Sequence, residues 1–295
     1  MSFLASFIMR GRIQAMTVAS TLALLSLIFP PISIISSAAV ALVTLRRGGL
    51  EGLTILGSSS LAAGLLGAFL IGNYLFPLLY VMVLWLPVWL ISIVLREGRH
   101  LSLAVEIAVL LGVIGVISFY GYVDDPLTIW KQALAQMVPA NAPVEDIQHT
   151  IDILAHYMTG VVAAGSVFGL LLGLFLGRWW QAILFNPGGF KQEFLALQTQ
   201  PRLALISVGV VGFAWFASGV YSEIAWNITI LLFVLYTFIG SAIMHTLFAN
   251  MKLHRYLVPM FYLTLFLVPH ALLPVTLVGL ADPWLDLRKK VKQIN

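Results

Sequence analysis

Four side chains of the types that commonly bind metals recur along one face of a predicted helix. Their separations of i, i+4, i+7 and i+11 place them in one stripe, which comprises Glu145, His149, Asp152 and His156. Imidazole nitrogens and carboxylate oxygens with this spacing could hold a divalent ion such as Zn²⁺ or Ni²⁺. The solvated face of an amphipathic helix has the same spacing. Both interpretations stay open.

Two ionisable residues inside apolar runs are ligand-binding candidates, because charge at membrane depth is costly and often marks function. Glu106 lies seven residues after Arg99, with which it could pair instead. His270 lies between Pro269 and Pro274, where a broken helix would free carbonyls that need protein or a water-filled cavity around them. A kinked packing helix is the alternative for this segment.

A third candidate group stands at the start of another apolar run. Glu223, Trp226 and Asn227 combine a carboxylate, an indole and an amide within about one helical turn. Together they could line an outward-facing ligand pocket. Trp226 could equally anchor the helix at the membrane interface.

The sequence contains no catalytic constellation. It has no G-x-S-x-G, H-E-x-x-H or P-loop motif. Zero cysteines exclude disulfides, thiolate metal sites and cysteine nucleophiles. We therefore expect neither an enzyme nor a cofactor, and any ATP hydrolysis would come from a partner.

The elements that carry these residues are predicted to be membrane helices. Hydrophobic residues make up 60% of the chain and charged residues 9%, with a mean hydropathy of +0.99. Apolar runs recur at lengths that suit a hydrocarbon core of about 30 Å, and irregular backbone or open strands would leave polar groups unsatisfied there. The sequence predicts an all-α polytopic transmembrane bundle, one integral membrane domain over residues 1–295, with about eight spans and a proline-broken C-terminal hairpin. The predicted spans are 13–29, 32–45, 53–72, 74–95, 101–122, 153–177, 203–221 and 226–250, and the hairpin is 256–281.

Charge distribution predicts the orientation. With a cytoplasmic N-terminus and a C-terminal hairpin, Lys131 is the one outer residue among 16 Lys and Arg, as the positive-inside rule requires. This arrangement predicts a multi-pass membrane protein with a cytoplasmic N-terminus. The net charge of +4 then reflects topology and contact with lipid. No basic stripe with stacking aromatics indicates nucleic-acid binding.

Residues 123–152 are predicted to form an outer amphipathic helical insertion. Asp125 can cap a helix that begins at Pro126, with an apolar face that would lie on the membrane or cover a cavity. After a break at residues 139–143, Val144 begins a second apolar periodicity that continues into the sixth span. We expect that helix to run into the bilayer without interruption.

Two rows of small residues suggest close helix packing, because small side chains let membrane helices approach. One row is Gly165, Gly169, Gly173 and Gly177, and the other is Ala15, Ala19 and Ala23. The alanine row could instead form a docking face for another membrane protein.

The closing run G-x-x-D-x-W-x-D-x-R resembles the end of the YybS-like family of bacterial membrane proteins. Its residues here are Gly279, Asp282, Trp284, Asp286 and Arg288. The early part also resembles that family, with Pro30-Pro31 followed by the turn Arg46 to Gly52. The family has no settled activity.

The helix pattern of that family is similar to the substrate-binding S components of energy-coupling factor transporters, which dock through an alanine row on the first helix. The resemblance implies a solute-binding transport subunit that takes a small-molecule ligand and meets its partners through Ala15, Ala19 and Ala23. More spans than the usual six, and the broken hairpin, depart from that pattern. The alternative is a structural or assembly protein of the bacterial envelope that does not transport.

Overall fold

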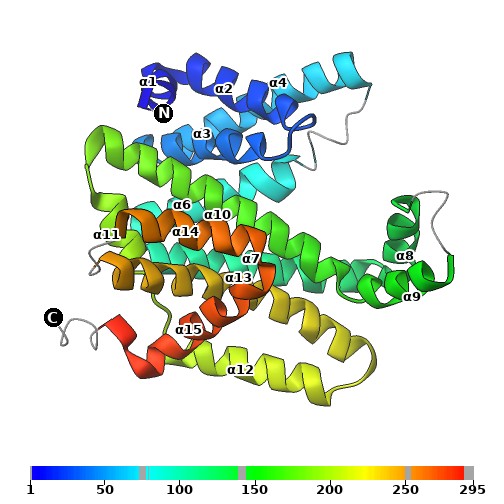
Figure 1. The fold of residues 1–295 in the computed structure, drawn as a ribbon. Coiled ribbons are helices and arrows are strands. Elements are labelled where there is room, and N and C mark those ends of the chain that lie inside the picture. The colour runs from blue at the N-terminus through cyan, green and yellow to red at the C-terminus, as the bar shows by residue number, and fades with distance from the viewer. Residues whose placement is uncertain (1, 73–77, 79, 139–143, 250–253, 289–295) are drawn as a thin grey trace. The chain divides into compact units, whose positions relative to one another are not determined.

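In the computed structural model, the chain is described over residues 2–72, 78, 80–138, 144–249 and 254–288. Every regular element in these ranges is a helix, and they contain no strand (Figure 1). Contacts divide the chain into two compact units. Unit 1 is Met1–Ala108 with Ser166–Leu197, and unit 2 is Val109–Gly165 with Gln198–Asn295. Helices α7 (Leu101–Tyr122) and α10 (Met158–Phe185) contribute residues to both units.

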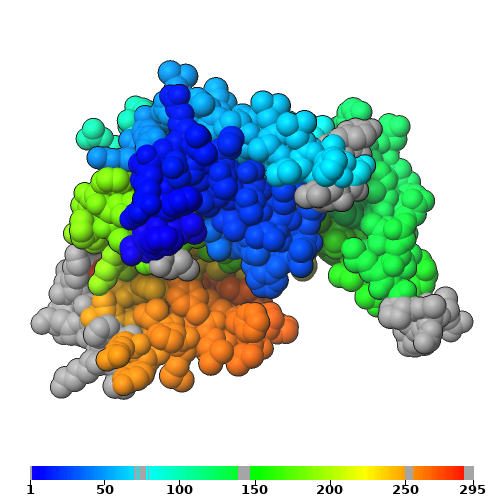
Figure 2. Space-filling model, turned by 90° about the horizontal axis from the view of Figure 1, so that it is seen from above, coloured from blue at the N-terminus to red at the C-terminus, as the bar shows by residue number. Residues whose placement is uncertain are grey.

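Unit 1 is built around α3, because its small residues let neighbours approach from all sides. Residues 36–45 of this helix are buried without interruption. Helices α2, α4 and α6 pack on α3, and Figure 2 shows the blue N-terminal helices beside cyan α4 as one continuous surface. The helices that belong wholly to this unit are α1 (Ser2–Arg10), α2 (Arg12–Leu25), α3 (Ile32–Arg47), α4 (Gly49–Ile71), the π-helix η1 (Val81–Trp85), α6 (Leu86–Gly98) and α11 (Gly189–Leu195).

Two residues of the glycine row lie directly against α3. A Cβ atom built at Gly173 would lie 2.8 Å from Cβ of Ser37, and one at Gly177 would lie 2.7 Å from Cβ of Ala41. These positions therefore need glycine for close approach. A Cβ at Gly165 or Gly169 would meet no described atom within 4 Å, so there the row has no such contact.

The alanine row is buried within unit 1, where α2 packs on its neighbours. Ala15, Ala19 and Ala23 are each at most 1% exposed, and α2 packs on α3 and α4. Ser36 Oγ donates a hydrogen bond of 2.7 Å to the carbonyl of Ala19. Docking of a partner through the same residues would require this internal packing to open.

Unit 2 is built around the long helix α13, on which α12, α14 and α15 pack. Helices α13 and α15 touch through glycines, because a Cβ at Gly240 would lie 2.0 Å from the carbonyl oxygen of Val275, and one at Gly279 would lie 2.1 Å from that of Tyr236. The helices wholly in this unit are α8 (Pro126–Gln136), α9 (Val144–Ala155), α12 (Pro201–Phe216), α13 (Gly219–Ala249), α14 (His254–Leu267), the 3-10 helix η2 (Pro269–Ala271) and α15 (Leu272–Leu285).

Within the described residues, five segments are long and apolar enough to cross a membrane: residues 49–69, 81–98, 101–122, 158–185 and 219–249. The number rises to six if the bent pair formed by residues 255–267 and 269–285 counts as one span. Helices α2, α3 and α12 have 14, 16 and 16 residues. At about 1.5 Å per residue they are shorter than a hydrocarbon core of about 30 Å. The structure therefore confirms a helical membrane protein but not the predicted eight spans.

The break predicted from the C-terminal prolines is present, since the chain bends by 119° between α14 and the segment that begins at Pro269. In the segment predicted to be an outer insertion, Asp125 caps α8, as predicted, and accepts a hydrogen bond from the backbone N–H of Thr128. The expected uninterrupted sixth helix is wrong. Helix α9 ends at Ala155, and α10 begins at Met158 after a turn.

Candidate functional site

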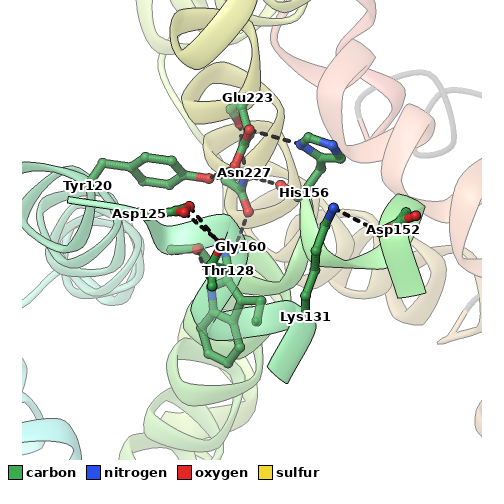
Figure 3. A network of polar contacts seen from close by, with 11 residues as sticks. Tyr120, Asp125, Thr128, Lys131, Asp152, His156, Gly160, Glu223 and Asn227 are labelled. Atoms are coloured by element: carbon green, nitrogen blue, oxygen red, sulfur yellow. Dashed lines mark hydrogen bonds and ion pairs between the residues drawn. The ribbon is translucent and has the colours of Figure 1, made fainter. Parts of the chain in front are cut away.

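Residues of unit 2 from α7 and α13, and from the turn between α9 and α10, meet in one polar network through their side chains (Figure 3). Tyr120, in the last turn of α7, donates a hydrogen bond of 2.6 Å to Oε1 of Glu223 on α13. Nδ1 of His156, in the turn after α9, lies 2.9 Å from Oε2 of the same carboxylate. Both oxygens of Glu223 are thus engaged by residues from other elements.

Asn227 forms the buried end of this network. It lies one turn after Glu223 on α13, and it is fully buried. Its Oδ1 accepts a hydrogen bond from the backbone N–H of Gly160, and its Nδ2 donates to the carbonyls of His156 (2.7 Å) and Glu223 (2.8 Å). The first N–H groups of a helix have no intrahelical acceptor. Asn227 therefore caps α10 from a distant helix and holds the turn that carries His156.

Glycine at position 160 makes this contact possible. A Cβ there would lie 2.7 Å from the backbone Cα and O of Asn227. Real Cβ atoms do not come this close to backbone atoms, and packed interiors cannot absorb such an overlap without a shift. The start of α10 can therefore lie directly on α13 only because residue 160 has no side chain.

Helices α8 and α9 support the network from the side. Trp130 on α8 donates a hydrogen bond of 2.8 Å to Oγ1 of Thr159, and its ring lies 5.7 Å from that of Phe119. Nζ of Lys131 lies 2.8 Å from Oδ1 of Asp152, which joins α8 to α9. The hydrogen bond from Lys131 lowers the pKa of the Asp152 carboxyl below its usual value.

Exposure changes steadily across the network. The side chain of His156 is 47% exposed and that of Glu223 is 17% exposed, whereas Asn227 is inaccessible. A solute could thus reach the imidazole and carboxylate, while the amide keeps the backbone beneath them in place. This arrangement can bind a polar solute through hydrogen bonds and charge.

The described residues of the predicted metal-binding stripe do not come together in one site. Among these residues, no group of three or more His, Asp or Glu is placed to hold a metal ion. Asp152 contacts Lys131, His156 contacts Glu223, and His149 is exposed. The side chain of Glu145 lies outside the described residues. Metal binding by this stripe stays a prediction.

The ligand-binding candidates lie in different places. Glu223 and Asn227 belong to the network, and Trp226 stacks edge to face on Trp215 of α12, with ring centroids 6.1 Å apart. Glu106 is half-buried in the part of α7 that belongs to unit 1. His270 is exposed in η2.

Sequence analysis missed two members of the network, Tyr120 and Gly160. A tyrosine near the end of an apolar run is typical of a membrane interface, and Gly160 lies outside the glycine row at positions 165 to 177. Nothing in the residues that surround Tyr120 or Gly160 in the sequence indicates that their partners lie on α13.

The closing motif has a local structural role. Asp282 accepts a hydrogen bond of 3.3 Å from the backbone N–H of Leu287 and lies 3.8 Å from Nε of Arg288. Asp286 adopts a left-handed conformation with φ of 44°, which ends α15. Gly279 makes the close contact with α13, and Trp284 is 52% exposed. These contacts terminate α15 and fasten it to α13.

Comparison of the chain with protein-family models, with curated proteins and with solved structures finds no match.

Proposed function

We propose that this membrane protein is the solute-binding subunit of a transport system, and that Tyr120, His156, Glu223 and Asn227 form its solute site. The observation that carries the proposal is the contact between Glu223 and His156, at 2.9 Å, on a turn held by a fully buried amide. Ionisable groups within or beside membrane helices are costly and usually serve a function. Here two such groups, Glu223 on α13 and His156 in the turn after α9, lie in contact.

The arrangement of exposure supports binding of a solute over a purely structural role. A polar contact that serves only to hold the fold together stabilises it most when its groups are fully buried and all their hydrogen bonds are made. Here the amide beneath is buried, while nearly half of the His156 side chain surface is accessible. The resemblance to S components through the YybS-like family points the same way, because those subunits capture a small molecule and leave ATP hydrolysis to partners.

The orientation belongs to the same proposal. A cytoplasmic N-terminus in the bacterial inner membrane puts Lys131 outside and the remaining Lys and Arg inside. The network lies at the C-terminal end of α7 and the N-terminal end of α13. In this orientation, and with α12 crossing the membrane, both ends lie on the outer side. An outward-facing site is the position that a subunit collecting external solute requires.

Native mass spectrometry of the detergent-purified chain, with metal analysis of the same sample, tests the proposal. We expect a small molecule or metal bound at one copy per chain. Glu223→Gln and His156→Ala should remove it, because each change removes a charge or hydrogen-bonding group that faces the accessible end. His149→Ala is the matched control, since His149 is an exposed histidine outside the network.

A protein that carries only lipid and is unchanged by these substitutions would contradict the proposal. That result would favour the alternative function, an envelope assembly protein whose polar groups are structural or solvated. Isolation of a stable envelope complex without solute would then identify its role. Loss in the His149→Ala control together with the other variants would instead support a ligand set on the predicted stripe.

A further inference from the structure

A second polar site lies in unit 1, where α3, α6, α10 and α11 enclose a cleft of about 250 Å³. Three arginines, one glutamine, one glutamate and two leucines line it: Arg96, Arg99, Arg178, Gln181, Glu193, Leu45 and Leu95. Drug-sized ligands occupy pockets of about 300–1,000 Å³. The cleft therefore suits a single small polar group.

The lining carries an excess of positive charge. The lining contains three guanidinium groups and one carboxylate, and that carboxylate is already paired with one of the arginines. Glu193 accepts from Nε (2.8 Å) and Nη2 of Arg178, a bidentate pair in which the Arg178 side chain is only 9% exposed. Arg96 and Arg99 thus lack a carboxylate within the lining.

The two remaining arginines differ in how they are held. Arg96 donates a hydrogen bond of 2.7 Å to the carbonyl of Leu45. Its Nε also lies 3.6 Å from Oε1 of Glu97, whose side chain is 75% exposed. Arg99 caps the end of α6 in a left-handed conformation, with φ of 55°. Within the described part of the chain, its guanidinium has no hydrogen-bond or ion-pair partner.

One backbone carbonyl joins three of the helices that line the cleft. The carbonyl of Leu45 near the end of α3 accepts from Arg96 of α6 and, at 3.2 Å, from Gln181 of α10. Guanidinium groups bind tetrahedral oxyanions well, since their planar forks donate two parallel hydrogen bonds. A net charge of +2 from three arginines and one glutamate matches a phosphate group.

We propose that the cleft formed by Arg96, Arg99, Arg178 and Gln181 binds a phosphate group, carried either by a phospholipid headgroup or by free phosphate. Arg178, neutralised by Glu193, forms the floor, Arg99 supplies an unpaired guanidinium, and Arg96 supplies the donors that its contacts with Leu45 and Glu97 leave. This site is independent of the solute site of unit 2, because the two share no residue.

The full-length chain, stripped of phospholipid by detergent exchange, provides the test. Native mass spectrometry measures binding of three probes: inorganic phosphate, dioleoylphosphatidylglycerol and dioleoylglycerol, which has the same acyl chains without phosphate. We expect one phosphate-bearing adduct per chain and none with dioleoylglycerol. Binding of phosphatidylglycerol alone identifies a lipid headgroup, whereas binding of inorganic phosphate identifies the free ion.

Arg99→Gln is the informative variant, since Arg99 is exposed and has no described partner whose loss would disturb the fold. It should weaken binding by about tenfold or more, because charge-assisted hydrogen bonds are lost. Arg99→Lys should restore part of the affinity. The matched control is Arg202→Gln, which removes an exposed guanidinium from α12 outside the cleft and should leave binding unchanged.

Absence of both phosphate-bearing adducts would overturn the proposal, as would equal losses in Arg99→Gln and Arg202→Gln. Melting temperatures of the variants show whether each one is folded. Glu223→Gln should leave phosphate binding intact, so a failure of the solute site and a failure of this cleft can be told apart.

Discussion

At the scale of single residues, Asn227 has the largest structural role in the network. Its amide satisfies the N–H of Gly160 at the start of α10, the carbonyl of His156 in the preceding turn, and a carbonyl of its own helix. A buried polar group left without a partner costs about 1–3 kcal/mol. One side chain therefore determines whether the turn that carries His156 can remain on α13.

Replacement of Asn227 by Ala should lower the stability of the protein by about 1–3 kcal/mol for each buried group left unpaired. The melting temperature in detergent should fall, and the amide of Gly160 should exchange faster with solvent. Thr229→Ala is the matched control on the same helix, because among the described residues Thr229 bonds only the carbonyl of Ala225 one turn back. Equal stability of the two variants would show that the cap is not needed.

At the scale of elements, helix α8 depends on local capping. Asp125 accepts from the hydroxyl of Thr128 (2.6 Å) and from its backbone N–H (3.1 Å). These hydrogen bonds lower the pKa of the Asp125 carboxyl below its usual value. Because the folded pKa is the lower one, the stabilisation of α8 is complete above the unfolded pKa. It is lost as pH falls through the folded value.

Helix α8 should therefore loosen at pH below about 4, near the ordinary pKa of Asp. Hydrogen exchange of its amides between pH 6 and pH 3, corrected for intrinsic rates, measures the change. Asp125→Asn provides the control, because asparagine also caps helices but does not titrate. The Lys131–Asp152 contact also weakens in acid, so the difference between wild type and Asp125→Asn isolates the cap. An identical acid response in both proteins would rule this explanation out.

At the scale of the whole molecule, the distribution of Lys and Arg makes the topology testable. The chain has no cysteine, so one can be introduced at exposed Met137 on the predicted outer side or at exposed Lys191 on the predicted inner side. A membrane-impermeant maleimide added to spheroplasts should label Met137→Cys. Lys191→Cys should react only after permeabilisation. The reverse pattern would invert the topology and place the candidate solute site inside.

Local sequence rules predicted much of the element-level structure. The dipeptide Asp125-Pro126 indicated a capped helix start, and the prolines at positions 269 and 274 indicated a broken segment. Both depend on neighbouring residues, since capping and proline geometry act within one turn. Spacing alone did not reveal that α9 stops at Ala155, because the interruption is held by Asn227, 71 residues after His156.

The sequence by itself determined a helical membrane protein and singled out Glu223 and Asn227, because apolar run length and rare polar residues are properties of short stretches of chain. Only the tertiary structure decided which partners these residues take. Tyr120 reaches Glu223 across 103 residues, and His156 reaches it across 67. It likewise brought Arg96, Arg99 and Arg178 together around one cleft. Such contacts arise from helix packing, which no periodicity within a single helix specifies.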